Sequence, residues 1–202
     1  LHICIAECEK ATEPFAPLHT LLGQALLESG HALEAIDALK VSTKLDPSDP
    51  LPRVQLIKAY LVLNLPGEAM RVVDECRRIV GNSIELECLA AMAIIAAKEQ
   101  KPEFCERTLK QFGKHLHEYP YDFEAFALAM DVASKLARRD WGQSFSQTLD
   151  LREGCDFSTV LSKLPAILKK MNELRWHDVA QTIIDKSITV CKLQGTGSGF
   201  TQ

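Results

Sequence analysis

The sequence predicts an all-α solenoid built from stacked helix hairpins. Small residues recur at intervals of 34 to 38 positions, and each is followed by core-type residues at helical spacing. Prolines and helix-capping residues separate the recurring units. The 202 residues are 47% hydrophobic but only 6% aromatic, and the abundance of alanine and leucine favours helices.

The second helix of each unit is marked by a small residue near its start. These anchors are Ala35, Ala69, Cys105, Gly142 and Ala180. The residues four positions later are Leu39, Val73, Leu109, Ser146 (beside Phe145) and Ile184. The residues seven positions later are Ser42, Cys76, Phe112, Leu149 and Ser187. Offsets of four and seven share one helical face, so a small anchor lets this helix approach its partner closely.

A first helix precedes each anchor. The corresponding segments are 18–28, 54–63, 86–98, 123–137 and 164–174. In the earliest of them, Leu22, Gly23 and Leu26 have the spacing of a packing face. Pro165 lies in the last segment, so we expect a kink or a late start there.

The turns and boundaries carry their own signals. We expect Pro47 to end one helix, and Asp49 to cap the next with Pro50 at its first position. Pro120 and Asp122 repeat this arrangement. Within the second unit, we expect Pro66 and Gly67 to form the turn and to start the following helix.

These signals predict one repeat domain over residues 1–193, followed by a flexible tail at 194–202 that includes the glycines of "GTGSG". We expect a half-unit at 1–14 and then five repeats, at about 16–49, 50–83, 84–120, 121–155 and 156–193. Ile5 and Cys8 occupy second-helix positions of the half-unit, and the chain begins at Leu1 rather than methionine. We therefore expect a fragment of a longer array, whose targeting signals cannot be read.

The first complete unit resembles a tetratricopeptide repeat (TPR). It matches the family pattern at Leu22, Gly23, Leu26, Ala35, Leu39, Ser42 and Pro47. The second unit matches with Tyr60, Ala69, Val73 and Cys76, but has Gly81 where the pattern has proline. The resemblance implies a right-handed superhelical solenoid whose first helices line an inner groove, which in TPR proteins typically holds a peptide or a helix of a partner.

The repeat register places a set of residues on this expected groove. They are Thr20, Gln24, Val54, Gln55, Lys58, Leu89, Met92 and Asp131. Gln24, Gln55 and Lys58 could hydrogen-bond an extended backbone or a carboxylate. An amphipathic array also produces such rows as ordinary solvated surface, so this alternative stays open.

We therefore expect a scaffold or adaptor that binds a protein or peptide partner, within a multiprotein complex. One alternative is a regulatory or substrate-positioning region of a larger enzyme. A helical-repeat RNA binder is disfavoured by the formal charge of −4. The carboxylate clamp of chaperone-tail adaptors is also absent, because Thr20, Gln24 and Gln55 replace its lysine and asparagines. Self-association through apolar helix faces remains a further option.

No catalytic residues, cofactor or metal site are expected. Cys4 and Cys8 are four residues apart, but no second ligand pair accompanies them. Most of the seven cysteines have the character of core thiols in a reducing compartment, so we expect an intracellular protein, cytoplasmic or nuclear. No apolar run is long enough to insert into a membrane.

Two further residue sets have a structural interpretation. The basic pairs, among them Arg77-Arg78, are expected on solvated helix faces. Trp141 and Trp176 fall at the turn or where second helices begin, so we expect them to cap helices or to pack between repeats. The alternative is that an exposed tryptophan there marks a partner interface on the outer edge of the array.

Overall fold

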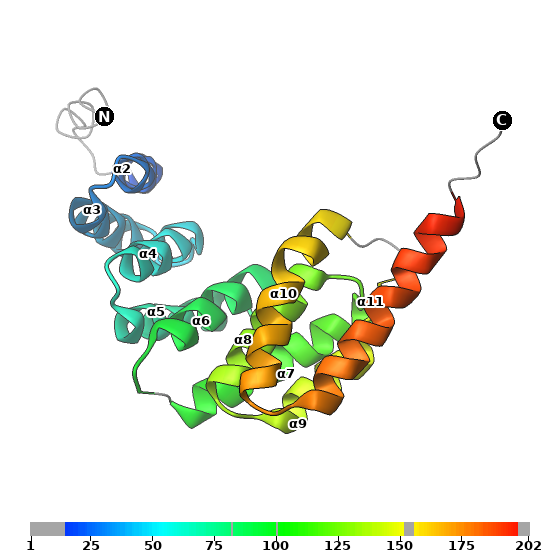
Figure 1. Cartoon of the computed structure of the whole chain (residues 1–202). Helices are drawn as coiled ribbons and strands as arrows, with labels where there is room; N and C mark the ends of the chain where they lie inside the picture. The colour runs from blue at the N-terminus through cyan, green and yellow to red at the C-terminus, as the bar shows by residue number, and fades with distance from the viewer. Residues whose placement is uncertain (1–14, 82, 100, 152–155, 198–202) are drawn as a thin grey trace. The chain divides into compact units, whose positions relative to one another are not determined.

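The computed structural model describes residues 15–81, 83–99, 101–151 and 156–197. All the regular secondary structure in this part of the chain is helical (Figure 1). The chain divides into two compact units, Leu1–Gln100 and Lys101–Gln202. Their boundary lies inside the repeat predicted at 84–120, a division that the sequence pattern does not indicate. The half-unit expected at 1–14 lies outside the described residues.

Unit 1 alternates first and second helices. Its described helices are α2 (Ala16–Glu28), α3 (Ala32–Leu45), α4 (Leu51–Val62), α5 (Pro66–Val80) and α6 (Ile84–Ala96). Each helix packs on the next along the chain, and the first helices α2, α4 and α6 also pack on their neighbours in this series. This double contact is the hairpin stacking of a solenoid.

Unit 2 repeats the alternation. Its described helices are α7 (Pro102–Glu118), α8 (Phe123–Lys135), α9 (Arg139–Thr148), α10 (Phe157–Glu173) and α11 (His177–Gly197). The first helices α8 and α10 pack together, and the second helices α7, α9 and α11 form a second row (Figure 1). The unit therefore has two layers of helices.

The same turn joins the two helices of four hairpins. A residue with positive φ ends the first helix, and the residues are Gly30 (83°), Asn64 (54°), Ala137 (52°) and Arg175 (59°). The next amide in each turn donates to a carbonyl five residues earlier at 2.8 Å, as from His31 to Leu26 and from Trp176 to Met171. This is the Schellman arrangement, which satisfies carbonyls that the helix end leaves free.

The predicted core positions are confirmed. All five anchors and all five residues at offset seven are buried. At offset four, Leu39, Val73, Leu109 and Ser146 are buried, whereas Ile184 is only half-buried and its neighbour Ile183 lies in the core. In the fifth repeat, the core residue therefore stands at offset three from the anchor instead of offset four.

Close helix approach depends on two glycines. A β-carbon placed on Gly23 would lie 2.4 Å from Cγ of Leu39, so α2 can pack this tightly on α3 only without a side chain there. A β-carbon on Gly142 would lie 2.7 Å from Cζ3 of Trp176. Trp176 is buried and packs between repeats, as predicted.

The capping predictions hold in substance. Asp122 caps α8, and its carboxylate accepts a hydrogen bond from the Ala125 amide at 3.0 Å. Asp49 accepts from the Leu51 amide at 2.9 Å, although α4 begins at Leu51, one residue later than expected. Pro66 is the first residue of α5, as predicted.

Two boundary predictions differ from the structure. The first helix of the fifth repeat, α10, does not start late: it begins at Phe157 and continues through Pro165. The helix α11 extends to Gly197 and so includes the first four residues of the tail predicted at 194–202. Among the described helices, none combines the length and hydropathy that a membrane crossing requires.

Candidate partner-binding surface

Each first helix of unit 1 has accessible side chains along one side, and we call these residues together the first-helix face. It consists of Leu21, Gln24, Glu28, Gln55, Lys58, Val62, Glu85 and Met92. Within each helix these residues follow offsets of three, four or seven, so they share one side of the helix. Lys58 of α4 pairs with Glu85 of α6 at 3.9 Å, which shows that neighbouring helices contribute to the same surface.

Two of the predicted groove residues are buried in the helix packing. The Thr20 hydroxyl lies 2.7 Å from the Ser42 hydroxyl and 3.3 Å from the Ala16 carbonyl oxygen, so its hydrogen bonds are satisfied inside the α2–α3 hairpin. Leu89 is 7% exposed. A short polar side chain with a partner across the hairpin can turn inward at no cost in lost hydrogen bonds. Neither residue offers side-chain surface to a partner.

Other predicted residues in unit 1 are accessible. Gln24 donates a hydrogen bond to Glu28 at 3.1 Å. Val54 and Gln55 are half-buried, and Met92 is 47% exposed. The pair between Lys58 and Glu85 is long and solvent-exposed, so a partner could displace it at low cost.

Asp131 belongs to unit 2, apart from the other predicted groove residues. Its carboxylate on α8 accepts a hydrogen bond from Lys170 of α10 at 2.9 Å. This contact ties two neighbouring repeats together. Asp131 therefore has a structural partner within its own unit.

The face also contains apolar residues that were absent from the predicted set. Leu21 is 60% exposed and Val62 is 67% exposed. Leu21 stands three residues before Gln24, and Val62 stands four residues after Lys58. Helical spacing from the predicted residues would have identified both. With Met92, they give the face an apolar character that suits an amphipathic helix.

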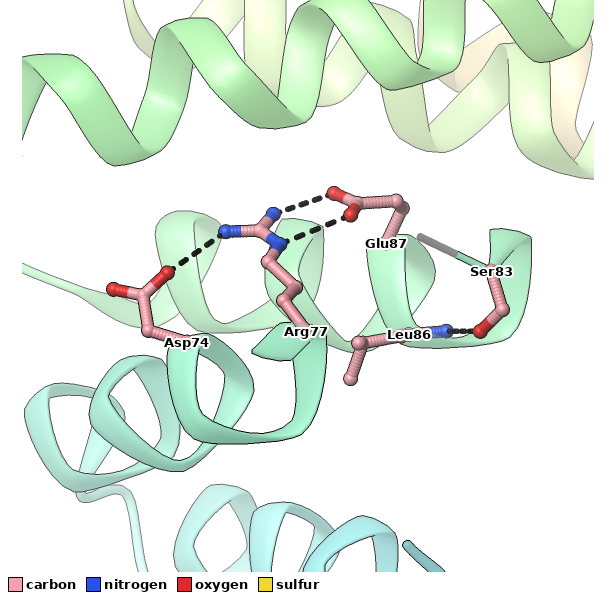
Figure 2. Close-up of polar contacts among 5 residues, drawn as sticks. All are labelled: Asp74, Arg77, Ser83, Leu86 and Glu87. Atoms are coloured by element: carbon pink, nitrogen blue, oxygen red, sulfur yellow. Dashed lines mark hydrogen bonds and ion pairs between the residues drawn. The ribbon is translucent and has the colours of Figure 1, made fainter. Parts of the chain in front are cut away.

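A buried ion pair fixes α5 against α6 (Figure 2). The Arg77 guanidinium donates two hydrogen bonds to the Glu87 carboxylate, at 3.0 and 2.6 Å, and a third to Asp74 at 3.1 Å. The side chains of Arg77 and Glu87 are 0% and 1% exposed. The prediction that Arg77 lies on a solvated face is therefore wrong, because a carboxylate of the next hairpin compensates its charge, whereas Arg78 is exposed as expected.

Two of the described cysteines lie in the core. Cys76 and Cys105 are buried in the core, as predicted for small apolar side chains, and burial raises the pKa of both thiols. No group of three or more histidine, cysteine or acidic side chains in the described part of the chain could hold a metal ion. Cys4 and Cys8 lie outside that part.

Solved structures share this arrangement of helices. Two structures of MamA match, one described as the segment from position 41 to the end from Desulfovibrio magneticus RS-1 and one as an RS-1 double mutant. Each is 17% identical with a TM-score of 0.60, and they cover 91% and 90% of this chain and 97% of their own. MamA is a TPR-type protein. The chain has a TPR-type repeat fold.

A family model matches part of this TPR-type chain. Residues 2–98 match the model described as "Bacterial transcriptional activator domain", itself a TPR-like helical family. The matched segment is just under half of the 202 residues, and all of it lies in unit 1. A comparison with curated proteins found no match.

Proposed function

We propose that this chain is a protein–protein interaction scaffold that captures an amphipathic helix or extended segment of a partner on the first-helix face of unit 1. The observation that carries the proposal is the exposure of Leu21, Val62 and Met92 on three adjacent first helices. Gln24, Gln55 and Lys58 lie among them, where they would set the register of a bound segment. No catalytic role is proposed.

The experiment is an affinity capture from native lysate with quantitative mass spectrometry. The test variant carries Val62→Glu and Met92→Glu, because charges on the apolar positions should abolish docking of an apolar helix face. The control variant carries Leu33→Glu and Ile79→Glu, two exposed apolar residues on the second helices α3 and α5. Circular dichroism checks the folding of both.

We expect one partner to be retained by the wild type and by the control, and lost with the test variant. A partner that survives Val62→Glu with Met92→Glu would rule out the first-helix face as its binding site. Loss with both variants would show that binding depends on exposed apolar surface in general.

The match of residues 2–98 favours a more specific setting. We propose that unit 1 acts within a transcription-regulating assembly, since the matched model describes a domain of transcriptional activators. A reporter assay with unit 1 tethered to a DNA-binding domain tests this setting. Activation by the wild type that Val62→Glu with Met92→Glu removes would support it, and equal activation by both would contradict it.

A further inference from the structure

Unit 2 has an open groove between the second helices α7 and α9. Its volume is about 850 Å³. Arg107, Lys110 and Lys114 form the wall from α7, and Trp141 stands on the wall from α9. The groove lies on the row of second helices of unit 2, and its lining includes no residue of the first-helix face.

The α7 wall carries three cations and one histidine. Arg107, Lys110, Lys114 and His117 follow one another at steps of three, four and three residues, so they share one side of the helix. Neighbouring like charges at this spacing destabilise an isolated helix. Arg107 and Lys114 form no ion pair with any described residue that would offset this repulsion.

The acidic residues nearby are largely engaged elsewhere. Glu106 accepts a hydrogen bond from Arg138 at 2.8 Å, and Lys110 reaches it only at 3.9 Å. Arg138 also donates a hydrogen bond to Asp140 at 2.7 Å. The hydrogen bond to Asp140 and, to a smaller extent, the one to Glu106 raise the pKa of the Arg138 guanidinium. The lining contains three basic residues, Arg107, Lys110 and Lys114, and two acidic residues, Glu103 and Glu106, so the groove has a small excess of positive charge.

The opposite wall supplies an aromatic surface with an unmet hydrogen bond. Trp141 packs over Gly113, where a β-carbon would lie 3.3 Å from Cζ3, and its ring stands 5.4 Å from that of Phe145. Its Nε1 is buried, and no acceptor among the described residues binds it. Because this nitrogen is buried, Trp141 contributes the apolar surface of its ring to the groove.

We propose that the groove between α7 and α9 binds an acidic segment of a protein chain. Its carboxylates pair with Arg107, Lys110 and Lys114, and one of its apolar side chains packs on Trp141. Charge complementarity selects this occupant. A nucleic acid is the poorer fit, because its closely spaced phosphates need an extended basic surface, whereas this chain has a formal net charge of −4.

The direct test is a fluorescence anisotropy titration with a labelled synthetic peptide of about ten residues, mostly glutamate with two phenylalanines. The variant Arg107→Glu with Lys114→Glu reverses the two unpaired cations. The control Lys135→Glu with Lys169→Glu makes the same charge change on α8 and α10, where both lysines are exposed outside the groove. The peptide is titrated at low and physiological salt, because pairing of exposed charges weakens as salt rises.

We expect the groove variant to bind the peptide at least tenfold more weakly than the wild type, and the control to stay within about twofold. A milder pair, Arg107→Gln with Lys114→Gln, serves if the charge reversal unfolds α7, and it should give a smaller loss in the same direction. Equal weakening in groove variant and control, or no binding by the wild type, would overturn the proposal.

Trp141 supplies a second readout. The chain has two tryptophans, and Trp176 is buried, so a change in emission on peptide addition should come from Trp141. We expect the change in the wild type and its absence in Trp141→Phe. Tighter binding of a single-stranded oligonucleotide than of the peptide, lost in the groove variant, would assign the groove to nucleic acid and reject an acidic peptide.

Discussion

The two units repeat one hairpin but hold neighbouring hairpins together by different means. In unit 1, Arg77 and Glu87 form a buried ion pair between α5 and α6, in addition to the exposed pair of Lys58 with Glu85. In unit 2, exposed pairs link residues 39 positions apart, such as Lys170 with Asp131 and Arg139 with Asp178. Each of those pairs joins equivalent helices of neighbouring repeats, α8 with α10 and α9 with α11. The same hairpin fold is therefore compatible with buried or with exposed ion pairs between neighbouring hairpins.

The turns of the two units share one backbone geometry but use different residue types. The left-handed position is taken by Gly30 and Asn64 in unit 1, which tolerate positive φ. In unit 2 it is taken by Ala137 and Arg175, which do not adopt it readily. The same backbone geometry therefore stores more strain in unit 2.

Breaking the buried pair should have the largest effect. Glu87→Ala leaves the Arg77 guanidinium buried without its principal counter-charge, and we expect a loss of about 3–5 kcal/mol in the free energy of unfolding. Chemical denaturation monitored by circular dichroism measures this. Replacing both partners, by Arg77→Met with Glu87→Leu, should restore most of the loss.

The matched control for this prediction is Glu68→Ala. Glu68 pairs with Arg71 at 3.1 Å on the exposed surface of α5, so its removal should cost at most about 1 kcal/mol. Similar losses for Glu87→Ala and Glu68→Ala would show that the Arg77–Glu87 pair does not hold unit 1 together.

Adding a methyl group at the glycines between helices should have the next largest effect on stability. Whether a variant gains or loses stability depends on the space around the added methyl group. Gly23→Ala in unit 1 and Gly142→Ala in unit 2 should each destabilise by about 1–2 kcal/mol, because overpacking exceeds the helix preference of alanine. Gly113→Ala should be near neutral or stabilising, since its β-carbon would lie 3.3 Å from Trp141. Thermal unfolding of the three variants ranks them, and a larger loss for Gly113→Ala would contradict the packing described.

Relieving the turns of unit 2 should have a smaller effect in the opposite direction. Ala137→Gly and Arg175→Gly should each stabilise by about 1 kcal/mol, because glycine accepts positive φ without the side-chain penalty. Gly30→Ala in unit 1 should destabilise by a similar amount. Melting temperatures compare the three, and no gain in either unit 2 variant would mean that these turns are not strained.

The smallest expected effect concerns acid. The hydrogen bond from Arg139 lowers the pKa of Asp178 from 3.8, so the carboxylate is more acidic in the folded chain. Stability from this pair is present above that ordinary value and is lost as pH falls below it through the folded pKa. Asp178→Asn should therefore reduce the acid sensitivity of unfolding, measured by denaturation at a series of pH values, and an unchanged pH profile would argue against the pair.

The sequence by itself determined the hairpins and their cores. The anchors Ala35, Ala69 and Gly142 are buried because helical periodicity is a local property that the chain specifies directly. Asp122 caps its helix for the same reason, since only three residues separate donor and acceptor. The TPR-type fold followed from these local signals.

The tertiary structure decided which polar side chains stay on the surface and which are buried against a partner. Thr20 and Arg77 looked polar and exposed, yet each meets a partner on another helix, Ser42 and Glu87 respectively. The division after Gln100 and the groove beside Trp141 were likewise hidden in the sequence. Such features depend on contacts between residues that no local period relates, so only the packed helices define them.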